Sequence, residues 1–214
     1  MERTLVITGK GKLSVNPDLV IIKFPVKARD LNYVTAVEKL NTQVKLIRNT
    51  IDSLGVGMEN LKTKDFRVNT LTRWNKRTEQ DDFLGFSAQH DLVLEIPFDH
   101  ALVNRIINSI TKCDNGIEFR IEFGVRDKES CLKELLVNAI KNAKEKALII
   151  AKTADVLLQE ILNINYSFAD VYFHSDTKLC YDNNSMMCGD ALMPDINPSD
   201  IDMSENVTVT WRIE

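Results

Sequence analysis

The side chains that most often carry out chemistry are scarce in this sequence. Its 214 residues include three histidines and four cysteines. His90 precedes Asp91 in a segment with strand-like alternation, so the two side chains should point to opposite faces and cannot form a catalytic pair. His100 beside Asp99 fits the capped start of a helix, and His174 has no fixed partner in the sequence. We therefore expect no catalytic residues and no enzymatic activity.

The cysteines lack the spacing of a metal site. They are Cys113, Cys131, Cys180 and Cys188. No two of them form a C-x-x-C pair, and no histidine stands at zinc-finger spacing. Cys131 lies on a predicted helix face, where a cysteine behaves as a small hydrophobe. Cys180 and Cys188 flank a polar segment and could form a disulfide in an oxidising compartment, but without a signal peptide we expect free thiols.

One acidic segment carries oxygen ligands at a spacing similar to that of a calcium-binding loop. Asp195, Asn197 and Ser199 match the first, third and fifth ligands. Asp200 stands where such a loop needs glycine, and Asn206 stands where it needs glutamate. Two interpretations stay open, namely weak divalent metal binding by these residues and a solvated acidic loop. The incomplete motif favours the solvated loop.

Gly9 and Gly11 come closest to a phosphate-binding loop. No third glycine follows at the required spacing, and no helix starts there, because residues 16–18 (Asn-Pro-Asp) form a turn into a strand. The sequence also lacks a Walker A loop, a G-x-S-x-G elbow and an H-E-x-x-H helix. We therefore expect no bound cofactor.

The charge balance argues against a nucleic-acid partner. The 31 Asp and Glu residues outnumber the 27 Lys and Arg residues, giving a net charge of -4, so no overall positive field attracts a phosphate backbone. A local basic cluster surrounds Trp74 and consists of Arg67, Arg73, Lys76 and Arg77. Base stacking and phosphate binding are conceivable there. Charges at a hairpin tip are more typical of solvated surface, so we expect no nucleic-acid binding.

The N-terminal residues, MERTLVITGKG, contain one short apolar stretch that Gly9 and Lys10 interrupt. They include neither the apolar core of a signal peptide nor the ~20 apolar residues of a membrane span. We expect no transmembrane segment and a cytoplasmic location for the chain as given. Export is the alternative if a leader has been removed.

Three segments have the apolar spacing of amphipathic helices. They cover residues 33–54, 101–111 and about 127–156. Asn32 and Asp99 are expected to cap the first two. In the third helix an alanine recurs every four residues, at Ala139, Ala143, Ala147 and Ala151. Such a file of small side chains lets a neighbouring helix or sheet approach closely.

Alternating and β-branched segments predict strands at residues 4–7, 19–27, 62–74, 83–96, 117–125, 160–168 and 206–213. Pro25 cannot donate to a ladder, so the strand that contains it is predicted at an edge or with a bulge. Residues 62–96 should form a long hairpin. Residues 174–205, rich in Asp, Asn, Ser and Met, are predicted to form a mobile acidic loop. Hairpins mixed with helical crossovers predict an α+β fold in two lobes, with a mixed, largely antiparallel sheet and three main helices.

Taken over its whole length, the chain resembles the SIMPL-domain family, which includes bacterial periplasmic immunogenic proteins. The opening ITGKGKLSVNPDLVIIKFPV resembles the family's first two strands and the small-residue turn between them, with Gly9, Gly11, Pro17 and Asp18 at the turn. The pieces KTKDFRVNTLTRW and FLGFSAQHDLVLEI resemble its long hairpin, including a Gly-aromatic step at Gly85. NAIKNAKEKALIIAKTADV resembles its alanine-rich helix, and NVTVTWRI its closing strand. The resemblance covers about residues 3–213 and implies a single domain over residues 1–214.

The resemblance also implies a role without catalytic residues. Some bacterial members are linked to oxidative-stress tolerance, and some to ring-like or channel-like homo-oligomers. Our leading hypothesis is therefore a non-enzymatic, self-associating protein of poorly defined, stress-related role. The alternative is a ligand-binding or divalent-metal-binding module that uses the acidic loop at residues 176–205. A hydrolase is a third hypothesis, which requires the fold to bring a histidine next to a carboxylate and a nucleophile.

Overall fold

The computed structural model describes residues 3–111, 117–166, 171–181 and 196–214. The chain divides into two compact units. Unit 1 consists of Met1–Pro17, Gly124–Asp176 and Pro198–Glu214, and unit 2 consists of Asp18–Phe123 and Thr177–Asn197. Each unit combines helix with antiparallel sheet, which confirms the α+β prediction.

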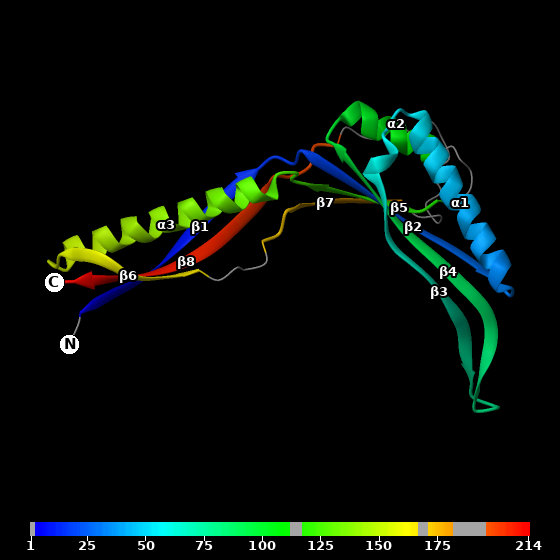
Figure 1. Cartoon of the computed structure of the whole chain (residues 1–214), viewed down its shortest axis with the longest axis horizontal. Coiled ribbons are helices and arrows are strands. Elements are labelled where there is room, and N and C mark those ends of the chain that lie inside the picture. The colour runs from blue at the N-terminus through cyan, green and yellow to red at the C-terminus, as the bar shows by residue number, and fades with distance from the viewer. Residues whose placement is uncertain (1–2, 112–116, 167–170, 182–195) are drawn as a thin grey trace. The chain divides into compact units, whose positions relative to one another are not determined.

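The elements of the described residues are coloured in chain order in Figure 1. They are β1 (Thr4–Val15), β2 (Leu19–Asp30), α1 (Tyr33–Ser53), the short 3-10 helix η1 (Met58–Asn60), β3 (Leu61–Asn75), β4 (Gln80–Pro97), α2 (His100–Thr111), β5 (Phe119–Gly124), α3 (Lys128–Thr153), β6 (Leu158–Tyr166), β7 (His174–Tyr181) and β8 (Ile201–Ile213). The three α-helices and the β3–β4 hairpin lie where the sequence predicts them.

Unit 1 is a three-stranded sheet, in the order β1-β8-β6, with α3 packed on one face. β1 and β8 pair without a register break from Thr4–Arg212 to Val15–Ile201. Because side chains alternate along a strand, one residue in two faces the helix. Ile7, Val209 and Trp211 on this face pack against the alanine file of α3. The close approach predicted from the alanines is confirmed.

Gly9 and Gly11 lie inside β1, so the prediction of a turn at these two residues was wrong. A Cβ atom on Gly9 would lie 2.5 Å from the backbone nitrogen of Ala143, and one on Gly11 would lie 2.9 Å from that of Ala139. The helix backbone already occupies the space that a side chain needs. The two glycines therefore serve a helix-on-strand contact, while Pro17 and its neighbours form the connection from β1 to β2.

Unit 2 contains a five-stranded sheet in the order β3-β4-β2-β5-β7. β2 lies between β4 and β5, so the prediction of an edge strand at Pro25 was wrong. The register of β2 with β4 is unbroken, and Pro25 stands opposite Asp91. Extended backbone tolerates the fixed φ of proline, so the strand loses only one ladder donor.

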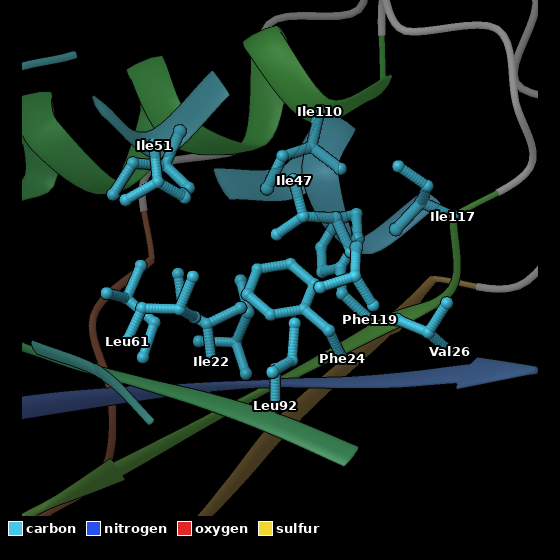
Figure 2. Packing of buried hydrophobic residues seen from close by; sticks show 14 of the residues in the cluster. Ile22, Phe24, Val26, Ile47, Ile51, Leu61, Leu92, Ile110, Ile117 and Phe119 are labelled. Carbon is cyan, nitrogen blue, oxygen red and sulfur yellow. The ribbon is translucent and has the colours of Figure 1, made fainter. Parts of the chain in front are cut away.

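The core of unit 2 forms where α1 and α2 meet the sheet (Figure 2). Phe24 of β2 and Phe119 of β5 are buried with their ring centroids 6.5 Å apart. Ile47 of α1 and Ile110 of α2 close over them, and Leu92 of β4 lies beneath. Fully burying such side chains stabilises a fold by about 1.5–3 kcal/mol each. This core fixes the base from which the hairpin extends.

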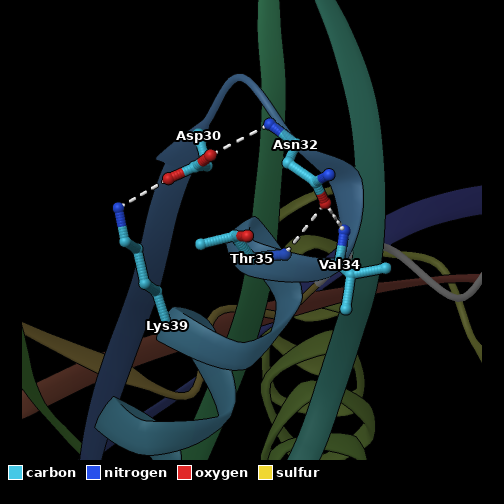
Figure 3. Close-up of polar contacts among 5 residues, drawn as sticks. All are labelled: Asp30, Asn32, Val34, Thr35 and Lys39. Carbon is cyan, nitrogen blue, oxygen red and sulfur yellow. Dashed lines mark hydrogen bonds and ion pairs between the residues drawn. The ribbon is translucent and has the colours of Figure 1, made fainter.

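The turn from β2 into α1 is held by a connected set of side chains (Figure 3). The Asn32 side-chain oxygen accepts hydrogen bonds from the Val34 and Thr35 backbone nitrogens at 2.8 and 3.3 Å, which confirms the predicted cap. The Asn32 backbone nitrogen donates to Asp30, whose other carboxylate oxygen lies 2.6 Å from the Lys39 ammonium. The bond from Lys39 holds the pKa of Asp30 below its usual value. The end of β2 is thereby locked to the start of the helix.

The prediction of an acidic loop over residues 174–205 was wrong at both ends of that range. Its first residues form β7, and β8 starts at Ile201. Burial alternates in both segments, with Ser175, Ile201 and Met203 buried, although polar neighbours hide the pattern in the sequence. Residues 182–195 lie outside the described residues.

Candidate functional site

His90 and Asp91 point to opposite faces of β4, as predicted. His90 stands opposite Val26 and Phe66 and is half-buried. Its Nε2 lies 2.8 Å from the hydroxyl oxygen of Thr63. A histidine beside a hydroxyl has the form of a base and its nucleophile, but in a catalytic triad the other ring nitrogen donates to a carboxylate. The Nδ1 atom of His90 is buried and has no hydrogen-bond partner among the residues that the structure describes, so within them this pair lacks the group that would orient it.

The surroundings of His90 also weaken it as a proton acceptor. Burial lowers its pKa below the usual 6.5, and the positive charge of Arg48 lowers it further, against an opposing effect of Asp91. The unfolded chain therefore takes up a proton before the folded chain does as the pH falls. The free energy of unfolding should decrease below pH 6.5 and stop decreasing once the pH is below the folded-state pKa.

Replacing His90 should reveal this effect. We expect His90→Gln to flatten the decline of the unfolding free energy between about pH 7 and about pH 5, because the folded-state pKa of His90 no longer contributes. Urea unfolding at a series of pH values measures the slope. His100→Gln, on α2, is the matched control, because it makes the same exchange of side chains elsewhere in unit 2. A slope that survives His90→Gln in full would contradict the assignment.

The other two histidines occupy the starts of elements. The ring of His100 lies 4.5 Å from that of Phe98. Beside it, the side-chain oxygen of Asp99 accepts a hydrogen bond from the Ala101 backbone nitrogen at 2.8 Å, so Asp99 caps α2 as predicted. His174 begins β7 and belongs to unit 1, whereas His90 and His100 belong to unit 2.

The structure describes three of the four candidate metal ligands. Asp195 lies outside the described residues. Asn197, Ser199 and Asp200 are exposed in the segment before β8. The backbone oxygen of Ser199 accepts a hydrogen bond from the Ser175 hydroxyl at 2.7 Å, which ties this segment to β7. Across the part of the chain that the structure describes, no group of three or more His, Cys, Asp or Glu residues could hold a metal ion.

Cys131 is buried on α3 beside Leu135, as the helical pattern predicts. Cys180 is exposed on β7. Cys113 and Cys188 lie outside the described residues, so the state of the Cys180 and Cys188 thiols stays a prediction.

Glu205 carries a buried carboxyl group and lies in the segment that the sequence predicts as an acidic loop. It is 2% exposed and lies on the face of β8 that α3 covers. One side-chain oxygen accepts a hydrogen bond from the Asn206 backbone nitrogen at 2.9 Å, and the other has no hydrogen-bond partner. Burial raises the pKa of Tyr166, and the negative charge of Glu205 adds to the rise. The alternation of buried residues from Ile201 onward could have revealed this position.

The β3–β4 hairpin is a long two-stranded ribbon that extends from the sheet of unit 2 (Figure 1). β3 forms an edge of the sheet, and of its 15 residues only Leu61 is buried. β2 ends opposite Phe86, so the part of β4 before that residue pairs with β3 alone. Large apolar side chains are exposed on this ribbon: Phe66, Trp74, Phe83 and Leu84, at 49%, 57%, 52% and 46%. A long edge strand and exposed aromatic rings together are typical of an association surface.

One of the two edge strands of unit 1, β1, is covered, in contrast. Three side chains of α3 hydrogen-bond to backbone atoms of β1 that do not face β8. The pairs are Lys10 N with Asn142 Oδ1 at 3.0 Å, Lys12 O with Asn138 Nδ2 at 3.3 Å, and Thr8 O with Lys146 Nζ at 3.1 Å. A strand whose outer atoms are occupied in this way is closed to a further strand.

A scan against models of protein families matches residues 5–211 to SIMPL, described as a protein of unknown function (DUF541). The chain belongs to the SIMPL family. The match extends from β1 to β8 and confirms the resemblance seen in the sequence. A search of curated proteins found no match. In the described part of this SIMPL chain, no helix is long and apolar enough to cross a membrane.

The basic cluster predicted around Trp74 of this SIMPL protein is not a basic patch. Arg67 lies away from the tip, with a guanidinium nitrogen 3.2 Å from the Gln89 side-chain oxygen and another 3.5 Å from the Asp65 carboxylate. Residues 73–82 contain equal numbers of positive and negative side chains: Arg73, Lys76 and Arg77 are positive, and Glu79, Asp81 and Asp82 are negative. The tip is therefore neutral and carries both signs of charge.

Proposed function

We propose that this SIMPL protein is non-enzymatic and acts by associating with copies of itself through the β3–β4 hairpin. The observation that carries the proposal is the exposed edge of β3. Its 15 residues contain no proline and no glycine, so every residue of the strand keeps its backbone donor and no glycine weakens it. Unpaired backbone groups along such an edge are a template for a second chain.

A comparison with other edges supports this choice of surface. α3 occupies the outer edge of β1. β6 pairs irregularly with β8, with register shifts on both sides of Ile161, and such shifts interrupt the backbone pattern that an added strand needs. Among these strands of the described residues, β3 offers the longest regular edge. Because β3 carries both positive and negative side chains, it can also complement an identical strand.

The absence of catalysis is part of the proposal. Among the described residues, the pair of His90 and Thr63 lacks an orienting carboxylate, and burial of the imidazole, together with the Arg48 charge, lowers its pKa and disfavours its protonated form. The stress-related role that the family resemblance implies belongs to the same proposal, with the assembled protein as the active form. Shape and association, rather than chemistry, then account for function.

The proposal predicts self-association that depends on the hairpin. Sedimentation velocity over a range of protein concentrations should show species larger than the 24.4 kDa monomer. Replacing Phe66, Trp74 and Leu84 with serine should weaken the association by roughly a hundredfold or more, because exposed apolar side chains at the centre of an interface contribute about 1–2 kcal/mol each. Ile149→Ser is the matched control, since Ile149 is 65% exposed but lies on α3.

A wild-type protein that stays monomeric at every concentration and ionic strength would reject the proposal. Equal weakening by Ile149→Ser and by the hairpin variant would instead place the association surface elsewhere. Circular dichroism of each variant establishes that the folded content is unchanged.

A further inference from the structure

We propose that two copies of this chain pair their β3 strands antiparallel about a two-fold axis at Asn69. The inference rests on the proposed function and adds the partner strand, its direction and its register. Two features of β3 support this pairing: the regular stretch of its edge and the positions of its charged residues.

The regular part of the β3 edge runs from Asp65 to the end of the strand. Lys64 has no partner on β4, because Thr63 stands opposite Leu92 and Asp65 opposite Asp91. This bulge, together with the charges of Lys62 and Lys64, blunts the first part of the edge. The second register shift arises from an extra residue on β4, so β3 itself is regular from residue 65 to residue 75.

Three charged residues lie on the regular part of β3, and they share one face of the sheet. Asp65, Arg67 and Arg73 are separated by even numbers of residues, so their side chains point the same way. They lie on the face opposite to that of Phe66, which pairs with His90. A partner strand must therefore place its own charges on this face in a complementary order.

A two-fold axis at Asn69 meets this condition. In antiparallel pairing about residue 69, residue 65 of one copy faces residue 73 of the other, and residue 67 faces residue 71. Asp65 of each copy then faces Arg73 of the other copy, so this contact forms twice, once on each side of the axis. Arg67 faces Leu71, and Val68 faces Thr70, so no like charges meet. Nine residues, 65 to 73, pair without reaching the bulge.

The charge on Asp65 gives the axis at Asn69 a specific gain. Asp65 stands directly opposite Asp91 within its own chain, and like charges opposite each other on a sheet are unfavourable. Its contact with Arg67 is 3.5 Å long, and the Asp65 side chain is still 45% exposed. A second cation from the partner copy would offset the repulsion. An axis at Phe66 would also pair Asp65 with an arginine, Arg67, but it would place the Lys64 bulge of each copy inside the contact.

Charge exchange tests the register. Asp65→Arg sets two arginines against each other at each contact, and Arg73→Asp sets two aspartates together, so each variant alone should associate roughly tenfold more weakly or worse, as expected when attraction becomes repulsion at two sites. A mixture of the two variants should associate as tightly as wild type, because both contacts are then of opposite charge. The double variant Asp65→Arg/Arg73→Asp should also recover. Sedimentation velocity of each sample and of the mixture measures these affinities.

Arg67→Asp distinguishes the two axes. When the axis is at Phe66, it opposes Asp65 of the second copy and should weaken association more than Arg73→Asp does, whereas when the axis is at Asn69, it faces the uncharged Leu71 and should weaken association less than Arg73→Asp does. If the wild type associates but the mixture does not recover, the register is wrong and the proposed function stands. If the wild type is monomeric, both fail.

Discussion

Gly9→Ala should destabilise unit 1 by about 3 kcal/mol or more, near the upper end of what overpacking a core costs. The new methyl group would lie 2.5 Å from the Ala143 backbone nitrogen, so α3 must move away from β1. A flexible side chain could yield to the methyl group, but a helix backbone moves as a unit. Its displacement also loosens the contacts of Ala139 and Ala147 with the sheet.

Tryptophan fluorescence can follow unit 1 by itself. Trp211 is 4% exposed in its core, whereas Trp74 on the hairpin is 57% exposed. The chain has two tryptophans, so Trp74→Phe leaves Trp211 as the only reporter. In that background Gly9→Ala should shift the midpoint of the Trp211 transition in urea to a lower concentration.

Lys10→Ala is the control for Gly9→Ala. Lys10 is the next residue of β1 and is exposed on the opposite face, and its backbone hydrogen bond to Asn142 does not involve its side chain. We expect a change within about 0.5 kcal/mol, as for most surface substitutions. Equal effects of the two substitutions would show that the contact of β1 with α3 is not the cause.

Gly85→Ala should destabilise unit 2 by a similar amount, again about 3 kcal/mol. Two effects combine at this position. Gly85 has a φ of +124°, a conformation that strains other residues by about 1–3 kcal/mol. A Cβ atom there would also lie 2.5 Å from the backbone oxygen of Asp30. Since Asp30 holds Asn32 at the start of α1, movement of this strand end also disturbs the helix cap.

Gly55→Ala separates the two effects. Gly55 also has a positive φ, +73°, but nothing lies within 4 Å of its Cβ position. Only conformational strain applies there, so we expect a loss of about 1–2 kcal/mol. Hydrogen exchange of the strand amides around Ile22 and Leu92, which are buried in unit 2, gives both free energies. A Gly85 variant no less stable than the Gly55 variant would contradict the predicted clash.

Local patterns predicted the helices because their determinants are local. The stripe of α1 and the side chain of Asn32 lie within one segment, and neither depends on a distant partner. The two glycines of β1 behave differently. The residues around Gly9 predict a turn, yet the partners of Gly9, Ala139 and Ala143, are about 130 residues away in the chain. A rule based on neighbouring residues cannot detect such a contact.

The association surface was only partly accessible from the sequence for a related reason. Alternation predicts the β3–β4 hairpin, but which of its strands is exposed follows from the strand order, in which β4 pairs with β2. The same non-local pairing places Pro25 in a central strand. Strand β7 was missed because its buried alternation includes Ser175, a polar residue.

We expect the side chains of α3 that cover β1 to hinder fibril growth at that edge. The segment NVTVTW, residues 206–211 of β8, has no charge and no proline, and its four central residues are all β-branched. This composition is typical of amyloid-forming peptides. In the folded chain it is enclosed between β1 and β6. Asn138 and Asn142 are hydrogen-bonded to the outer backbone atoms of β1. A further strand can therefore pair with that edge only after α3 detaches from it. We therefore expect the helix that stabilises unit 1 also to slow amyloid growth.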